Sequence, residues 1–148
     1  MKSAVTLVFV LFLTSLFPSC SNEDDAQVSE QLTGTWLVLG YQNDGSTSLD
    51  TPPDGTEEIT ISFDGSAFNG NTGRNNFSGS YSIENDFLSF PSINSTEVAE
   101  SEWGTRFFNA LNEAYNSTSQ EYLLKFDIVQ GQLIIEYQTG NTLVLRKI

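Results

Sequence analysis

The sequence predicts a mainly β fold with one α-helix: a small curved antiparallel sheet, or partial barrel, closed by one amphipathic helix. Two observations carry this prediction. From Leu32 onward, apolar residues alternate with polar ones in short runs, which is the two-residue period of half-buried strands. Residues 101–115 instead repeat their apolar side chains at helical spacing. Because a half-buried sheet needs a cover, we expect this helix to close its open side.

Residues 1–19 have the order of a signal peptide. Lys2 precedes an apolar run over residues 4–17, and Pro18 follows that run. At about 1.5 Å per residue the run spans roughly 21 Å as a helix, less than the roughly 30 Å hydrocarbon core of a bilayer. The sequence therefore predicts a cleaved signal peptide and not a permanent transmembrane anchor.

Cys20, the single cysteine, directly follows the apolar run and Ser19. This arrangement resembles the lipobox of bacterial lipoproteins, in which the thiol is diacylated and becomes the mature N-terminus. We expect lipidation of Cys20, the alternative being a cleaved and freely secreted form. Two acyl chains anchor a protein stably, whereas one alone binds only marginally. The prediction is a lipid anchor in the outer membrane, facing the periplasm or the cell surface.

Residues 20–31 are interpreted as a lipidated, flexible acidic tether. The stretch SNEDD at 21–25 resembles the acidic export tag of surface lipoproteins from Bacteroidetes-type bacteria. The alternative is a solvated acidic linker without a targeting role. Both interpretations predict flexibility, and both place the folded domain at residues 32–148.

The strand predictions follow the alternation along the chain. Trp36, Val38 and Gly40 share one face of the first run, and residues 59–63 and 77–83 repeat the pattern. The last third predicts a meander of three strands, at residues 122–129, 132–138 and 142–147. Its connections, Gln130 with Gly131 and residues 139–141, are short enough for hairpin turns.

Residues 43–56 form a predicted long loop, since they lack periodicity and contain two adjacent prolines. The loop is acidic. Calcium binding by Asp44, Asp50, Asp54 and Glu57 is one interpretation, because hard cations take oxygen ligands. The spacing does not match an ordered calcium loop, which favours a solvated loop, and the sequence indicates neither a metal nor a cofactor.

The predicted helix of about four turns carries its apolar residues at steps of four, four, three and one. These residues are Trp103, Phe107, Leu111, Ala114 and Tyr115. Ser101 is the expected N-cap, and the acidic residues beside it suit the positive end of the helix dipole. The apolar face is expected to pack on the sheet, the alternative being a partner-binding helix.

From Leu32 to the C-terminus the order of motifs resembles the META domain family, which includes the HslJ-type heat-shock lipoproteins. The resemblance begins with L-T-G-T-W at residues 32–36 and passes through Phe63-Asp64-Gly65. Its most specific part is the G-x-N-x-F-x-G-x-Y block at residues 73–81, and it continues through residues 96–100, the helix and the closing hairpins. The L-x-G-x-W start alone is shared with lipocalin-like domains.

This chain departs from many members at two positions. Arg74 stands where they have the cysteine of Gly-Cys-Asn, and Glu100 where they have that of Met-Ala-Cys. We expect Arg74 and Glu100 to face each other and form a structural ion pair at the place of the two thiols. A guanidinium can bind a carboxylate through two parallel hydrogen bonds.

Composition excludes several classes of function. The chain has no histidine, which excludes the usual catalytic triads and metal sites with imidazole ligands. Nineteen acidic against six basic side chains give a net charge of −13, which argues against nucleic-acid binding through phosphates.

The resemblance implies a non-catalytic envelope module, binding or stress-related, tethered to the outer membrane through its N-terminal lipid. One alternative is a lipocalin-like barrel for a small apolar ligand, although a barrel this small is expected to be filled by side chains. Another is a hydrolase with paired carboxylates, the acid–base chemistry open to a chain without histidine. Glu57 and Glu58 are poor candidates, since neighbours on a strand point to opposite faces. Neither a ligand nor an envelope protein partner is identified by the sequence.

Overall fold

The computed structural model describes residues 23–148 and has two helices and eleven strands in that range. Their order is α1 (Glu23–Leu32), β1 (Gly34–Gln42), β2 (Thr60–Asp64), β3 (Ala67–Asn71), β4 (Asn76–Ser80), β5 (Ser82–Glu84), β6 (Phe87–Phe90), β7 (Asn94–Ser95), α2 (Glu102–Glu113), β8 (Tyr115–Asn116), β9 (Glu121–Val129), β10 (Gln132–Gln138) and β11 (Asn141–Lys147). Neither helix is long and apolar enough to cross a membrane.

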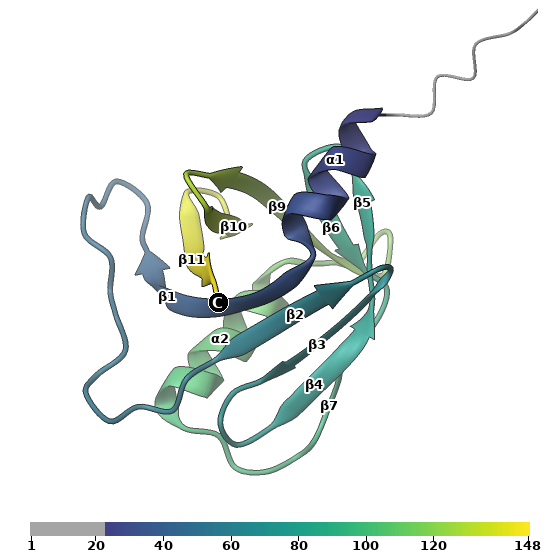
Figure 1. The fold of residues 1–148 in the computed structure, drawn as a ribbon. Coiled ribbons are helices and arrows are strands. Elements are labelled where there is room, and N and C mark those ends of the chain that lie inside the picture. Colours follow the sequence, from purple (N-terminus) through teal and green to yellow (C-terminus); the bar gives the residue numbers. More distant parts are fainter. Residues whose placement is uncertain (1–22) are drawn as a thin grey trace, which may run out of the picture.

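The strands form one antiparallel sheet that curls into a half-barrel (Figure 1). Its order is β5-β6-β9-β10-β11-β1-β2-β3-β4-β7, and β8 pairs with β9 beside this path. The predicted meander of three strands is confirmed as β9, β10 and β11. Gln130 and Gly131 both adopt positive φ, at 53° and 79°, as a two-residue hairpin turn requires.

The concave side of the sheet is filled by aromatic and aliphatic side chains. Phe77 lies at the centre of this core, with its ring centroid 5.2 Å from that of Phe107 on α2 and 6.4 Å from that of Phe68. Trp103, Phe107 and Leu111 are buried, so the apolar face of α2 covers the sheet as predicted. The helix therefore occupies the open side of the half-barrel.

A bulge in β1 changes the predicted alternation. Trp36 and Val38 face the core as expected, but the register of β1 against β11 shifts between Val38 and Gly40. The shift brings Tyr41 into the core, where it is fully buried.

Helix α1 corrects the prediction of a flexible tether, which is wrong from Glu23 onward. Leu32 is fully buried, and Val28 packs against the core. At the C-terminal end of the helix, the Trp36 indole donates to the Leu32 carbonyl at 2.7 Å and the Lys147 ammonium donates to the Gln31 carbonyl at 2.9 Å. These bonds satisfy carbonyls that a helix end leaves free.

Helix α2 is shorter than predicted. Ser101 is its N-cap, as expected, because its hydroxyl accepts from the Gly104 N–H at 3.0 Å. The helix ends at Glu113, and Ala114 is the buried C-cap. Tyr115 was expected on the apolar face of the helix, which is wrong: it lies in β8, half exposed, and packs edge-on against Tyr122. The pairing of β8 with β9 takes the chain out of the helix at this point.

Asn75 connects the β3–β4 turn to the segment that leads into α2. Its amide nitrogen donates to the Val98 carbonyl and to the Glu100 carboxylate, and its amide oxygen accepts from the Val98 N–H and the Thr96 hydroxyl. The Thr72 hydroxyl also donates to Glu100. Asn75 and Thr72 are buried, so this polar network is well shielded from water.

Glu100 continues this network to the first turn of α2. Its second carboxylate oxygen, Oε2, lies over Gly104, where a Cβ atom would collide with it. Glycine in a helix is normally less stable than alanine. Here the Glu100 carboxylate lies so close that a Cβ atom has no room, which explains why the position is a glycine. The network therefore fixes where the helix begins.

We expect Asn75→Ala to lower the free energy of unfolding by about 3 kcal/mol, because it removes one of the two donors to the shielded Glu100 carboxylate and leaves the Val98 N–H without its acceptor. Chemical denaturation measures the change. The control is Asn76→Ala, because the Asn76 side chain is exposed and bonds only to that of Asn71, so its loss is expected to cost less than about 1 kcal/mol. Equal losses in the two variants would contradict the role given to Asn75.

Candidate functional site

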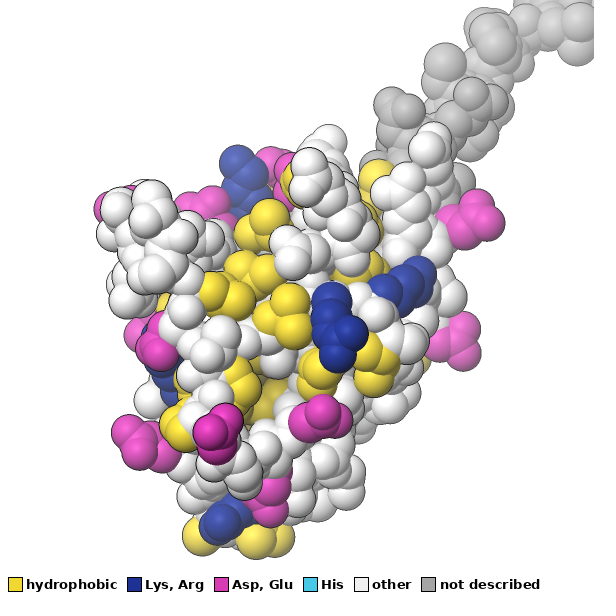
Figure 2. Space-filling view, turned by 60° about the vertical axis from the view of Figure 1, so that its left-hand side comes forward, with side chains coloured by type: hydrophobic (Ala, Val, Ile, Leu, Met, Phe, Trp, Pro, Cys, Tyr) yellow, Lys and Arg dark blue, Asp and Glu magenta, His cyan; other side chains and the backbone are white. Residues whose placement is uncertain are grey.

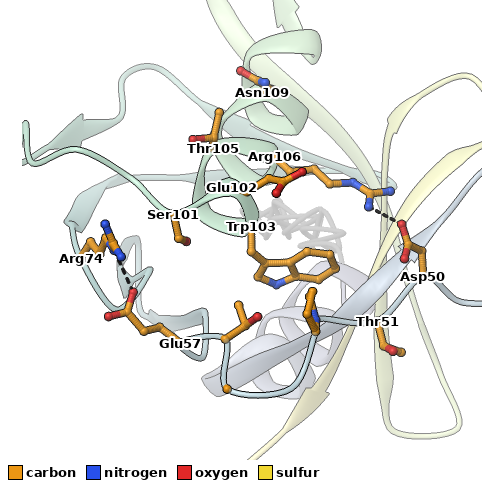
Figure 3. Close-up of a pocket in the computed structure, with 13 residues that line it drawn as sticks. Asp50, Thr51, Glu57, Arg74, Ser101, Glu102, Trp103, Thr105, Arg106 and Asn109 are labelled. Atoms are coloured by element: carbon orange, nitrogen blue, oxygen red, sulfur yellow. Dashed lines mark hydrogen bonds and ion pairs between the residues drawn. The ribbon is translucent and has the colours of Figure 1, made fainter.

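An open pocket of about 670 Å³ lies between the long loop before β2 and the first turns of α2 (Figure 3). The loop borders it on one side and the polar face of the helix on the other. Its lining residues are Asp50, Thr51, Pro53, Gly55, Thr56, Glu57, Arg74, Ser101, Glu102, Trp103, Thr105, Arg106 and Asn109. The volume is within the range of roughly 300–1,000 Å³ that is usual for small-molecule sites.

Trp103 lies in the middle of the pocket, between the loop and the helix N-terminus (Figure 3). Its ring packs edge-on against Tyr41, with centroids 4.9 Å apart and planes at 76°. Only 7% of the residue is exposed, so the pocket reaches a side chain that also belongs to the core. The fold thus holds this indole rigidly in place.

One end of the pocket is formed by Arg106 and Asp50, which form an ion pair. The Arg106 guanidinium carbon also lies 4.1 Å from the centre of the Tyr41 ring, a cation–π contact. Asp50 is positioned by backbone hydrogen bonds in both directions with Tyr41, at 2.8 and 2.9 Å. The bulge that buries Tyr41 therefore organises this end of the pocket.

The other end is formed by Arg74 and Glu57, whose Nε and Oε2 atoms are 3.1 Å apart. Arg74 also donates to the Ala99 carbonyl at 3.3 Å. Both side chains of this pair are nearly half exposed, so it contributes little to folding stability, at most about 1 kcal/mol. The pair contributes more to the shape of the pocket than to folding.

The predicted Arg74–Glu100 pair does not form. The two residues lie at the same corner, but Glu100 turns inward to accept from Asn75 and Thr72, while Arg74 turns outward to Glu57. The physical reason is that the neutral donors of the buried network, on Asn75 and Thr72, already bind the Glu100 carboxylate. The prediction that Arg74 and Glu100 lie near each other is correct, and the prediction that they form an ion pair is wrong.

The other predicted sites have different outcomes. Cys20 lies outside the described residues, so its lipidation stays a prediction. Of the acidic loop residues, Asp50 and Glu57 are each held by an arginine. In residues 23–148 the structure places no group of three or more acidic side chains where they could hold a metal ion.

Sequence reasoning missed the pocket, since it assigned Trp103 to the core and gave Arg106 no role. A signal was present, because Trp103 and Arg106 are three residues apart on one predicted helix and therefore share a face. The partner surface could not be found in the same way, since it comes from a loop about fifty residues earlier.

Fold and site together define a small β half-barrel domain closed by one helix, with a pocket on its outside. The META domain family matches residues 30–147, and the chain belongs to this family. This confirms the resemblance inferred from the sequence. No curated protein matches the chain.

Two solved structures show the same fold. An NMR structure of a protein from Burkholderia xenovorans has a TM-score of 0.60 and 20% identity, with 82% of this chain and 87% of that one covered. A duf4847 family protein from Bacteroides vulgatus has a TM-score of 0.57 and 16% identity, with coverage of 80% and 96%. At these identities the similarity concerns the fold alone.

Tyr41 predicts a dependence of stability on alkaline pH. Burial raises its pKa above the ordinary value of 10.0, an effect that the nearby Arg106 partly opposes. The folded chain therefore holds this proton more tightly than the unfolded chain, and the resulting stability is present below pH 10 and lost as the pH rises further.

We expect the unfolding free energy to fall less between about pH 9 and about pH 11 in Tyr41→Phe than in the parent chain. Denaturation at several pH values measures this slope. Burial also raises the pKa of Tyr81 and Tyr137, so part of the decline persists. The matched control is Tyr115→Phe, which deletes the same hydroxyl at a half-exposed position. Parallel slopes for Tyr41→Phe and the parent chain would count against this assignment.

Proposed function

We propose that this META domain protein is a non-catalytic binding module of the bacterial envelope, held in the outer membrane by lipid on Cys20 and facing the periplasm or the cell surface. The observation that carries the binding role is the open pocket between the loop and α2. The position of Cys20 after an apolar run supports the anchor. The resemblance to HslJ-type heat-shock lipoproteins supports a stress-related role for the module.

The position of α1 supports an orientation in which the pocket points away from the membrane. Glu23, the first residue of α1, follows Cys20 by three positions. The N-terminal end of α1 and the loop that borders the pocket lie at opposite ends of the domain (Figure 1). Since Trp36 and Lys147 fix the other end of α1, a lipid at Cys20 would hold the domain with its pocket outward.

Binding fits the pocket better than bond cleavage. Its acidic side chains at the two ends, Asp50 and Glu57, are each engaged by an arginine. A histidine is absent from the whole chain, and its only thiol is the one proposed to carry lipid. These features favour recognition over acid–base chemistry at the two ends of the pocket.

The lipocalin-like alternative would place a ligand inside the half-barrel. That space is occupied by the core, in which Phe63, Phe77, Phe90 and Leu133 are almost fully buried. The aromatic rings contact one another, as Phe68 and Phe90 do at 4.7 Å between centroids. The packing favours a ligand site on the outside of the sheet.

The anchor is tested by expressing the full chain with its own signal peptide. We expect it to partition into the detergent phase of Triton X-114 and to incorporate an alkyne fatty acid, because two acyl chains bind a bilayer stably. Cys20→Ser is expected to lose both properties, and Ser21→Ala to keep them. Protease treatment of intact cells separates surface display from a periplasmic position. An unlabelled parent chain in the aqueous phase would refute the anchor.

The binding role is tested by saturation-transfer NMR on the full chain with a mixture of oligosaccharides, fatty acids and blocked tripeptides. Thr105 is exposed and lines the pocket, so Thr105→Arg should fill it and abolish the signals of bound compounds. Asn112→Arg places the same side chain on the same helix outside the pocket and should preserve them. Signals that survive Thr105→Arg, or none with any compound, would contradict a binding role for this pocket.

A further inference from the structure

The charges around the pocket disfavour a charged ligand. Three carboxylates, from Asp50, Glu57 and Glu102, face two guanidinium groups, from Arg74 and Arg106, so the fixed charges nearly cancel. The whole chain has a net charge of −13, and acidic side chains are spread over the face shown in Figure 2. An anionic ligand would meet repulsion at long range, and a cationic one would compete with arginines already in place.

The helix N-terminus at the pocket does not change this conclusion. Ser101 caps the helix by accepting from the Gly104 N–H. The Glu100 carboxylate lies against the same turn, and Glu102 adds a further negative charge in it. Because these groups already balance the positive end of the dipole, the helix offers little to an added anion.

The two ends of the pocket suit a ligand that both donates and accepts hydrogen bonds. A guanidinium has five donors and a carboxylate about four acceptor positions, so the Arg106–Asp50 and Arg74–Glu57 pairs each keep free sites of both kinds. Thr51, Thr105 and Asn109 add hydroxyl and amide groups to the lining. Hydroxyl groups match such mixed sites, since each can donate to a carboxylate and accept from a guanidinium.

Between these polar ends, the pocket reaches the exposed part of the Trp103 indole, whose ring centre lies 5.5 Å from the Arg106 guanidinium carbon (Figure 3). The exposed part of the indole is an apolar surface that the C–H groups of an aliphatic ring can contact. A molecule with C–H groups on its faces and hydroxyls along its edge would meet the indole and both ion pairs at once. A pyranose ring has this arrangement of groups.

We propose that the pocket binds a short neutral oligosaccharide, with a sugar ring in contact with the exposed part of Trp103 and its hydroxyls bound by the Arg106–Asp50 and Arg74–Glu57 pairs. This inference rests on the proposed binding function and specifies its ligand class. Each arginine is already oriented by its carboxylate partner, so the side chains of the two ion pairs lose little freedom when the sugar binds.

The test uses the two tryptophans of the chain as separate reporters. The full chain, labelled with ¹⁵N and held in octaethylene glycol dodecyl ether, a detergent without a sugar head group, is titrated with maltotriose, cellotriose, xylotriose, mannotriose and N,N′-diacetylchitobiose. At least one of these should shift the Trp103 indole signal. The Trp36 indole, which is bonded to the Leu32 carbonyl outside the pocket, should stay in place.

Three further probes define the ligand class: trigalacturonate, the chitosan trimer and N-acetyl-trialanine amide. We expect each to bind at least about tenfold more weakly than the best neutral sugar. Thr105→Arg should abolish the shift, and Asn112→Arg should not. Arg74→Gln, which exchanges an exposed charge, should weaken sugar binding without unfolding the chain.

The outcomes separate this inference from the proposed function. If the peptide or a charged probe shifts Trp103 at a lower concentration than every neutral sugar and Thr105→Arg abolishes that shift, the pocket is a binding site and the ligand class is wrong. If no neutral sugar shifts the Trp103 indole at millimolar concentration, or if the shift survives Thr105→Arg, the oligosaccharide assignment is overturned.

Discussion

The hydrogen bonds of Asn75 are the constraint on which the rest of the structure depends. They join the β3–β4 turn to the segment before α2, and Glu100 extends them to the first turn of the helix. Because both the carboxamide and the carboxylate are shielded from water, few alternative arrangements would satisfy them. The start of α2 is fixed in this way, and Trp103 and Arg106 are placed with it. The pocket is therefore a consequence of how the helix is attached to the sheet.

The same corner shows how a fold can be kept while its chemistry changes. Arg74 and Glu100 stand where the resemblance to the META family implies two cysteines in many members. Glu100 has joined a buried network of neutral donors, and Arg74 has turned to the loop, where it holds Glu57. The two charged residues therefore have different roles: Glu100 connects the helix to the sheet, and Arg74 shapes one end of the pocket. A direct pair between them would have left the loop without this contact.

The fold was predictable from sequence because its main signals are local. Strand alternation, the Gln130–Gly131 turn and the Ser101 cap each depend on neighbouring residues, and the structure confirms them. The errors arose where distant contacts override local preference. The C-terminal end of helix α1 is held by Trp36 and Lys147, which donate to its last carbonyls, and Tyr115 leaves α2 because β8 pairs with β9. The candidate site was less predictable than the fold, because residues that are far apart in the chain make up its walls.

The sequence by itself determined the class of fold, the family and the charge balance, since these follow from periodicity, motif order and composition. Its resemblance to the META family also predicted that Arg74 and Glu100 lie near each other. Only the tertiary structure decided that they bind different partners, that a bulge buries Tyr41 beneath Arg106, and that an acidic loop and a helix face enclose a common pocket. The physical reason is that side-chain pairing across long loops depends on which donors and acceptors meet in space, which spacing along the chain does not specify.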